Sequence, residues 1–461
     1  MRSETKVKML VLGFDGASPI LIDRWIGDLP TFKMFKDRGI LGQTIPPTPA
    51  QTPVAWTTFM TGNNPGNHGI FSFAIREKGT YERIIVRPNM VKSKTLWKII
   101  SEKGKKVGVI NVPMSDVEDV KGFIVSGFLA KDEGTPYPKA VREKIRQRFG
   151  IDKIVGDLEV ETLDNAESNP DMFFERVNQI TDDMADICLY LLEEEKCDLF
   201  TTVFMAMDRI QHFFWKNIDE NHPRYEKNEY STRVKAIYVK ADKIISRFVK
   251  SVEEDTIVMV LSDHGFCPVH DEVFVNNYLE ELGILRVKDG NIDLENSRAV
   301  SYGYGDIWLN VKGREPHGKI QLGREYESAR EEIIGGLKEV EIDGKKPFKD
   351  VKKREDVYWG SCLDEAPDLM GIFNLGWQAA RRPEIVRKSE SKKYVNDNPR
   401  WSGGHDGTHD PNDVPGILAI LGSRVQRKDV RANLWDLAPT ILGAMSIPAS
   451  SSMDGKPLKI I

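Results

Sequence analysis

The stretch TIVMVLSDHG at residues 256–265 is an apolar run that ends in an aspartate, a histidine and a glycine. Near-continuous apolar runs of this length are what strands buried on both faces of a sheet require. Three further runs carry Asp or His residues at one end: VKMLVLGF at 7–14 before Asp15-Gly16, LFTTVFMAM at 199–207 before Asp208, and GILAIL at 416–421 after a loop with histidines. The four runs predict a buried sheet with polar residues at its strand ends.

The segments between these runs have the pattern of amphipathic helices. From Pro170 to Glu195 and from Tyr225 to Val252, apolar residues recur every three or four positions and charged residues lie between them. Alternating strands and helices predict an α/β fold, with a mainly parallel central sheet flanked by helices and right-handed crossovers. Ligands bind such sheets beyond the carboxyl ends of the strands, where Asp15, Asp208 and Asp263 fall.

Residues 268–404 differ in character from the rest of the chain. Phrases such as VKDGNIDLENS and EIDGKKPFKD are rich in turn residues and charges, and they separate short helical and strand-like pieces. Apolar strand character resumes after about His405. We therefore expect an inserted α+β cap domain at 268–404, with an α/β core formed by 1–267 and 405–461.

Composition excludes several classes of protein. The 461 residues are 29% charged and 40% hydrophobic, with a formal net charge of −5, which leaves no electrostatic footprint for nucleic acid. No apolar segment approaches the roughly 20 residues that cross a bilayer, and the N-terminus lacks a signal-like stretch. The four cysteines form no CxxC pair. These observations favour a cytoplasmic protein that acts on a small molecule, without a membrane or nucleic-acid partner.

Aspartates and histidines at the strand ends suggest metal ligands. Asp263 and His264 are adjacent, and Asp208 and His212 would share a helix face because residues four apart are neighbours. His405 and His409 follow in GGHDGTHD. Carboxylate and neutral imidazole are typical ligands of zinc and similar divalent ions, and there are enough here for two. Each aspartate taken singly could instead be a helix cap or a turn residue.

The stretch PPTPAQTPVAWTTFMTGN at 46–63 offers hydroxyl groups to such a site. Its first prolines hold the chain extended, and Pro53 suits the first turn of a helix that starts after Thr52. A threonine hydroxyl at a helix N-terminus lies where backbone N–H groups favour a phosphate, and metal coordination can activate it as a nucleophile. The alternative is that Thr52 only caps the helix.

The order of these motifs resembles the alkaline phosphatase superfamily over most of the chain. The match is closest to the type I phosphodiesterase/nucleotide pyrophosphatase branch and to its prokaryotic relatives described as predicted phosphohydrolases or phosphomutases. The motifs, in order, are FDG at 14–16, Thr52 with TGNNPGNHGIF, Asp208 with His212, SDHG at 262–265, GTH at 407–409, and WDLAPTIL at 435–442 followed by DGKPL at 454–458.

The resemblance implies a ligand set for two divalent ions, zinc in the first place with Mn²⁺ or Fe²⁺ as alternatives. The first ion would be held by Asp15, Thr52, Asp263 and His264, and the second by Asp208, His212 and a late histidine. His409 fits the family's Gly-x-His phrase and is the favoured late ligand. His405 is the alternative, or else a residue that orients the ligands.

The activity that the resemblance implies is hydrolysis of a phosphoric ester through a phosphothreonine at Thr52. Phosphodiesters or nucleotide pyrophosphates are the expected substrates, and phosphomonoester hydrolysis or phosphomutase chemistry is the alternative. A metal-stabilised binding protein without turnover is the rival from another class. One departure concerns substrate class, because Ser72 and Phe73 stand where eukaryotic nucleotide pyrophosphatases have a phosphate-binding asparagine.

Overall fold

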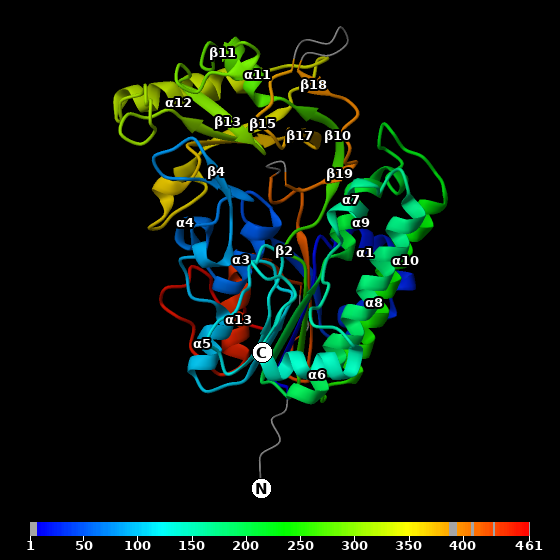
Figure 1. Cartoon of the computed structure of the whole chain (residues 1–461). Helices are drawn as coiled ribbons and strands as arrows, with labels where there is room; N and C mark the ends of the chain where they lie inside the picture. Colours follow the sequence, from blue (N-terminus) through cyan, green and yellow to red (C-terminus); the bar gives the residue numbers. More distant parts are fainter. Residues whose placement is uncertain (1–6, 387–393, 407–409, 427–428, 461) are drawn as a thin grey trace.

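A nine-stranded sheet forms the centre of the molecule (Figure 1). The computed structural model describes residues 7–386, 394–406, 410–426 and 429–460. In order across the sheet, the strands are β21 (Arg431–Asn433), β2 (Ile40–Ile45), β20 (Gly416–Leu421), β9 (Ile257–Leu261), β1 (Met9–Phe14), β8 (Leu199–Phe204), β5 (Val107–Ile110), β6 (Gly122–Val125) and β7 (Pro136–Tyr137). The strands from β9 to β6 are all parallel. The predicted α/β fold with a mainly parallel central sheet is confirmed.

One predicted strand, β20, runs against its neighbours. It pairs antiparallel with β9 and with β2, with Leu418 opposite Leu261. Its first residues therefore lie beside the carboxyl end of β9. Because β20 runs antiparallel to β9, the histidine-containing loop before β20 lies at the edge of the sheet where the parallel strands end.

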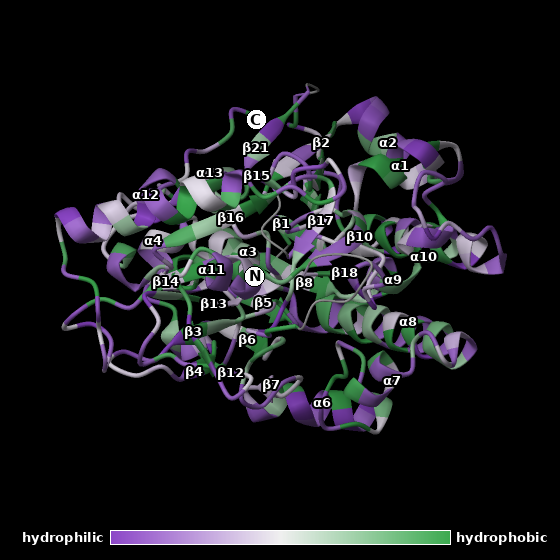
Figure 2. Cartoon of the chain, turned by 90° about the horizontal axis from the view of Figure 1, so that it is seen from above, coloured by the Kyte–Doolittle hydropathy of each residue, from purple (hydrophilic) through white to green (hydrophobic). Residues whose placement is uncertain are grey.

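Both faces of the sheet are covered by helices, as the apolar runs predict. Leu10 and Leu12 of β1 pack into a core with helices α8 (Pro170–Glu195) and α10 (Glu229–Lys250), whereas Met9 and Val11 pack into a second core on the other face. The second core includes α3 (Thr52–Thr61), α5 (Leu96–Glu102) and α13 (Leu437–Ala444). Figure 1 shows the two sets of helices on opposite sides of the sheet. Figure 2 shows that hydrophobic residues gather along the central strands, while α2 (Pro30–Arg38) and α12 (Arg324–Lys338) carry many hydrophilic ones.

A third core belongs to a separate layer above the sheet edge (Figure 1). Its four-stranded antiparallel sheet has the order β13 (Ala299–Gly303), β14 (Asp306–Leu309), β16 (Leu369–Phe373) and β15 (Phe348–Lys353), and it packs with α11 (Val275–Glu281) and α12. The buried residues of this core all come from 273–379. The domain limits at 268 and 404 stay predictions. Among the described helices, none is long and apolar enough to cross a membrane.

A hairpin of the sheet layer, β3 (Ala74–Arg76) and β4 (Arg83–Ile85), is bonded to this upper layer. Nη1 of Arg76 lies 2.7 Å from Oε1 of Glu315, and both side chains are almost fully buried. Nη1 of Arg83 donates to the carbonyl oxygen of Tyr302. Arg314, beside Glu315, donates a hydrogen bond from each of its terminal nitrogens to the buried Asp368. The Arg76 ion pair and the Arg83 hydrogen bond hold the hairpin against the upper sheet, and the Arg314 bonds to Asp368 lie within that sheet's layer.

Helix α3 begins at Thr52, one residue before the predicted start, and Gln51 is its N-cap residue. The Gln51 side chain does not cap the helix, because its amide accepts from the backbone N–H of Phe73 and donates to the carbonyl of Asp406. Pro53 lies in the first turn, as expected, and Gly62 ends the helix with a left-handed φ of 67°. The Thr-Gly pair is thus a helix C-terminus, where glycine adopts positive φ without strain.

His68 behind α3 should make folding stability depend on pH. Its Nε2 lies 3.0 Å from Oγ1 of Thr58, and its Nδ1 accepts from the backbone N–H of Ile70, so the ring is neutral. Burial lowers the pKa of His68 to about 3, from an ordinary 6.5. Below pH 6.5 the unfolded chain takes up a proton at His68 that the folded protein does not. The free energy of unfolding is therefore unaffected by His68 above pH 6.5 and falls by about 1.4 kcal/mol per pH unit below it. We expect His68→Gln to remove about 2 kcal/mol of the stability loss between pH 6.5 and 5.

The measurement is urea unfolding at both pH values in the presence of a chelator. His317→Gln is the matched control, because it removes an imidazole that is half exposed. An equal loss of stability in wild type and His68→Gln would contradict the assignment.

Candidate active site

The strand order brings the predicted ligands to one edge of the sheet. Because β1 lies between β8 and β9, the residues after these three strands become neighbours. Asp15 follows β1, and Asp263 with His264 follows β9. Asp208 lies in the first turn of α9 (Ala206–Phe214), which starts directly after β8, and His212 lies one helical turn further on. All five side chains are buried.

Two glycines near Asp15 permit the close packing of this edge. A Cβ at Gly13 would stand 2.4 Å from the ring of Trp56, so this glycine lets the indole lie against β1. The Nε1–H of Trp56 donates to Oδ2 of Asp15 at 2.8 Å. Gly16 has a φ of +70°, and a Cβ there would stand 2.9 Å from the Cα of Asp208. The FDG phrase and the glycine before it, residues 13–16, therefore supply one carboxylate and the two backbone features that seat it.

The first group of candidate ligands is Asp15, Asp263 and His264. Their ligand atoms lie within 4.8 Å of one another. Nε2 of His264 lies 3.0 Å from Oδ2 of Asp263 and 3.7 Å from Oδ1 of Asp15. Each aspartate uses its other oxygen within the protein, Asp15 for Trp56 and Asp263 for the backbone N–H of Gly16. One oxygen of each carboxylate thus faces the histidine.

The second group centres on Asp208. Its Oδ1 lies 3.1 Å from Nε2 of His405 and 3.3 Å from Nε2 of His212. The ligand atoms of Asp208, His264 and His405 also fall within 4.8 Å of one another, and the rings of His264 and His405 stack at 3.5 Å. The two groups therefore share His264 and form one continuous cluster.

All three described histidines of the cluster are oriented in the same way. Nδ1 of His212 lies 3.0 Å from the carbonyl oxygen of Gly403, Nδ1 of His264 lies 3.1 Å from that of Gly265, and Nδ1 of His405 lies 2.6 Å from that of Ala50. A carbonyl oxygen can only accept, so in each case Nδ1 carries the proton. In the neutral ring Nε2 then has its lone pair, which is the arrangement of metal-binding histidines.

The atoms that face one another are buried and lack hydrogen bonds, which fits a site for cations. Within the described part of the chain, this holds for Oδ1 of Asp15, Oδ1 of Asp208, Oδ2 of Asp263 and Nε2 of His264. Such atoms are costly to bury without a partner. Burial, together with the charges of Asp263 and Asp208, raises the pKa of Asp15 well above its ordinary value. Divalent cations would satisfy all four atoms and offset the carboxylate repulsion.

The electrostatic environment of Asp208 differs from that of Asp15, because positively charged and imidazole groups surround it. Burial favours its protonated form, but His212 and Arg209 outweigh burial and hold the pKa of Asp208 well below its ordinary value. For His405, burial opposes protonation, yet the carboxylate of Asp208 raises its pKa. Burial lowers the pKa of His212. Asp208 is therefore held as a carboxylate next to two imidazoles.

Thr52 lines a cavity of about 690 Å³, and the second group of candidate ligands lines the same cavity. The hydroxyl-bearing residue is buried at the first position of α3. The cavity is lined by Asp208, His212 and His405 and by the aromatic side chains Phe73, Phe128, Tyr304 and Trp401. Trp401 stacks on His212 with ring centres 3.6 Å apart. The cavity is large enough for an ester group, and it leads to the candidate nucleophile and ligands.

Several contributors were missed from the sequence. Trp56 could have been suspected, because it lies one helical turn after Thr52 and thus on the same side of α3. Arg209 directly follows Asp208 and donates from Nη1 to its Oδ2. Asp157, which pairs with Arg209, comes from a turn-rich stretch with no motif. Arg314 of the upper layer is paired with Asp368 and Glu315.

The late histidine remains a choice between two residues. His409, the favoured ligand, lies outside the described residues. His405, the alternative, is buried within the cluster.

Comparison with solved structures identifies the fold. The chain is 15% identical to human ectonucleotide pyrophosphatase/phosphodiesterase 5, with a TM-score of 0.59 and 97% of both chains covered. An inactive variant of the murine protein in complex with AMP gives a TM-score of 0.59 at 15% identity, covering 96% of each chain. Phosphonoacetate hydrolase from Sinorhizobium meliloti 1021, in complex with phosphonoacetate, gives a TM-score of 0.59 at 15% identity, covering 97% of each chain. No curated protein matches the sequence.

A family model settles the broader assignment. The model for type I phosphodiesterase/nucleotide pyrophosphatase matches residues 9–409, which is most of the chain and includes every predicted ligand. The superfamily resemblance carried by the sequence motifs is thereby confirmed, and it agrees with phosphoester hydrolysis as the class of activity. The chain belongs to the type I phosphodiesterase/nucleotide pyrophosphatase family.

Proposed function

We propose that the protein hydrolyses phosphodiesters or nucleotide pyrophosphates at a site for two divalent ions, with Thr52 as the nucleophile. The observation that carries the proposal is the cluster of buried ligand atoms without hydrogen bonds beside Thr52 and the cavity. Asp15, Asp263 and His264, with Thr52, would hold one ion, and Asp208, His212 and His405 the other. Zinc suits this donor set, and Mn²⁺ or Fe²⁺ are the alternatives.

When bound, the two ions would stabilise charge on the phosphoryl oxygens and lower the pKa of the attacking hydroxyl and of water. Oγ1 of Thr52 forms a bond to phosphorus as the bond from phosphorus to the leaving oxygen breaks. The leaving group is an alcohol from a diester or a phosphate from a pyrophosphate, and the proton that the threonine hydroxyl loses passes to that leaving oxygen or to solvent. Water then attacks the phosphothreonine, which releases the phosphomonoester and restores the hydroxyl of Thr52. The N-terminus of α3 favours the negative charge of the phosphoryl group throughout.

The orientation of the ligands is supplied by the chain itself. Carbonyl oxygens fix the three histidine rings, Trp56 fixes Asp15, and the backbone of Gly16 fixes Asp263. Ligands held in place before the ion binds need no rearrangement during the reaction. This preorganisation favours an enzyme over a binding protein that keeps a metal for stability alone.

The substrate class is tested with purified protein, Zn²⁺ or Mn²⁺, and two aryl esters. We expect hydrolysis of bis-p-nitrophenyl phosphate to exceed that of p-nitrophenyl phosphate by at least ~10-fold in kcat/KM, since the cavity has room for a second ester group. Preference for the monoester would instead favour the phosphomonoesterase alternative. Two bound ions with neither ester hydrolysed would favour a non-catalytic binding protein.

The late ligand is tested by alanine substitution at both histidines. We expect His405→Ala to lose one of two bound zinc ions, because Nε2 of His405 faces Oδ1 of Asp208. His409→Ala should keep both ions. Metal content is measured by atomic emission after gel filtration. Loss of an ion from His409→Ala alone would make His409 the ligand and leave His405 an orienting residue.

A further inference from the structure

Arg209 contacts one of the two carboxylate oxygens of Asp208. Its Nη1 donates to Oδ2 of Asp208 at 2.8 Å. The other oxygen, Oδ1, faces Nε2 of His212 and Nε2 of His405 and has no hydrogen bond. The two side chains are neighbours in α9, and both are almost completely buried. A charge-assisted bond in this position holds the carboxylate in one orientation.

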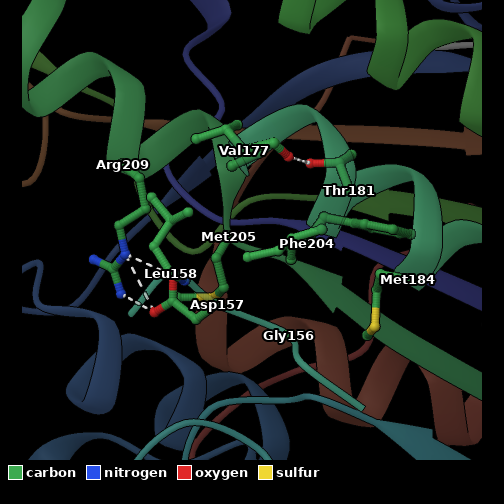
Figure 3. A pocket seen from close by; sticks show the side chains of 11 residues that line it. Gly156, Asp157, Leu158, Val177, Thr181, Met184, Phe204, Met205 and Arg209 are labelled. Carbon is green, nitrogen blue, oxygen red and sulfur yellow. Dashed lines mark hydrogen bonds and ion pairs between the residues drawn. The ribbon is translucent and has the colours of Figure 1, made fainter. Parts of the chain in front are cut away.

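Asp157 holds the guanidinium group of Arg209 from its other edge. Nε of Arg209 donates to Oδ1 of Asp157 at 2.9 Å, and Nη2 donates to Oδ2. The pair is drawn in Figure 3, where dashed lines run from the guanidinium group to the Asp157 carboxylate. Forked pairing of this kind fixes the plane of the guanidinium group as well as its position. Arg209 is thus clamped between two carboxylates.

The surroundings of the clamp are mainly apolar on one side. Leu158, Val177 and Phe204 line the pocket next to the pair (Figure 3), and the ring of Phe128 lies 5.5 Å from the guanidinium carbon. The side chains of Arg209 and Asp157 are only 13% and 15% exposed. Arg209 and Asp157 line both this pocket and the larger cavity, so their own ion pair, more than packing around it, holds the guanidinium group in place.

We propose that Arg209, oriented by Asp157, is a positioning residue that fixes Asp208 so that Oδ1 alone faces the metal site. The inference rests on the proposed function, because it takes Asp208 as a metal ligand. Asp157 belongs to the stretch 153–160, which lines the same cavity as Asp208. The clamp thus connects the wall of the cavity to the ligand.

The test compares Asp157→Asn with Asp152→Asn. Asp152 is close to Asp157 in the sequence and forms an ion pair with Arg146. Both of these side chains are more than half exposed, and their ion pair is not one of the contacts that lead to Asp208. Zinc affinity is measured by competition with a chromogenic chelator. We expect Asp157→Asn to bind one of the two ions about 10- to 100-fold more weakly, as is typical when a partner of a metal ligand is lost. Asp152→Asn should stay within about twofold of wild type.

Further variants separate positioning from a loss of folding. Asp157→Glu keeps the carboxylate and should recover most of the affinity, and Arg209→Lys keeps the charge without the fork and should not. In Asp157→Asn, raising the zinc concentration should restore kcat with little change in KM, which a folding defect would not allow. Thermal unfolding in chelator monitors the fold of each variant.

The outcomes are distinct from those of the proposed function. If wild type binds no zinc, the metal site itself is wrong. If wild type binds two ions and Asp157→Asn and Arg209→Lys match Asp152→Asn in affinity and kcat, then the clamp has only a structural role and the inference is overturned.

Discussion

Thr52→Ala is expected to lower kcat/KM on an aryl phosphodiester by at least ~10³-fold, because it removes the attacking oxygen. The residue is buried at the first position of α3 and opens into the cavity beside Asp208 and His405. Alanine is tolerated in the first turn of a helix, and Gln51 rather than Thr52 is the N-cap residue. Loss of the hydroxyl should therefore leave the fold intact and affect mainly kcat.

Thr61→Ala is the matched control for this substitution. Thr61 lies in the last turn of the same helix, and its hydroxyl donates to the carbonyl of Thr57. We expect Thr61→Ala to keep kcat/KM within a few-fold of wild type, at a cost in stability of about 1 kcal/mol. Acid quenching during turnover should trap phosphothreonine in wild type and in Thr61→Ala, but not in Thr52→Ala. Undiminished turnover by Thr52→Ala would rule out the nucleophile.

The central sheet was predictable because its strands are buried on both faces. A strand such as 257–261 must be apolar throughout, so its limits can be read from the sequence, and the Asp-His-Gly after it marks where it ends. The direction of β20 was not predictable in the same way. An apolar run looks alike in parallel and antiparallel pairing, and only the path of the chain through the upper layer decides which is formed.

The candidate ligands were predictable to the extent that they follow strands. Asp15, Asp208 and Asp263 stand one to four residues after strands that the sequence indicates, so the fold alone brings them together. Asp157 is different, since it comes from an irregular stretch whose path depends on tertiary packing. No periodicity or motif indicates that a carboxylate 51 residues before Asp208 will clamp the arginine next to it.

The choice between His405 and His409 shows a second limit. Family resemblance weighs the phrase around a histidine, and it favours His409. The structure adds the direction of the chain, since β19 (Gly403–Gly404) pairs with β10 (Cys267–Val273) directly after the SDHG strand end. This pairing carries His405 to the stack with His264. Spacing along the sequence contains no equivalent of that strand pairing.

Asp263→Asn is expected to have opposite effects on stability with and without metal. Asp15, Asp208 and Asp263 are buried close together, and the pKa of Asp15 is raised by burial and by the other two charges. A carboxyl whose pKa is raised by folding destabilises the protein as pH rises above its ordinary pKa. Removing the Asp263 charge relieves that repulsion. We expect the metal-free variant to gain about 1–3 kcal/mol in free energy of unfolding at pH 7.

With zinc present, the same substitution should destabilise the protein relative to wild type. Asparagine keeps Oδ1 as an acceptor for the backbone N–H of Gly16, but it replaces the anionic oxygen that faces His264. Zinc affinity should fall by at least ~100-fold, and with it the stabilisation that a bound ligand gives. Asp255→Asn, an exposed position before the same strand, is the control and should behave as wild type. Thermal unfolding in chelator and in zinc gives all six values. A variant less stable than wild type in chelator would show that Asp263 stabilises the empty site and that the carboxylates do not repel.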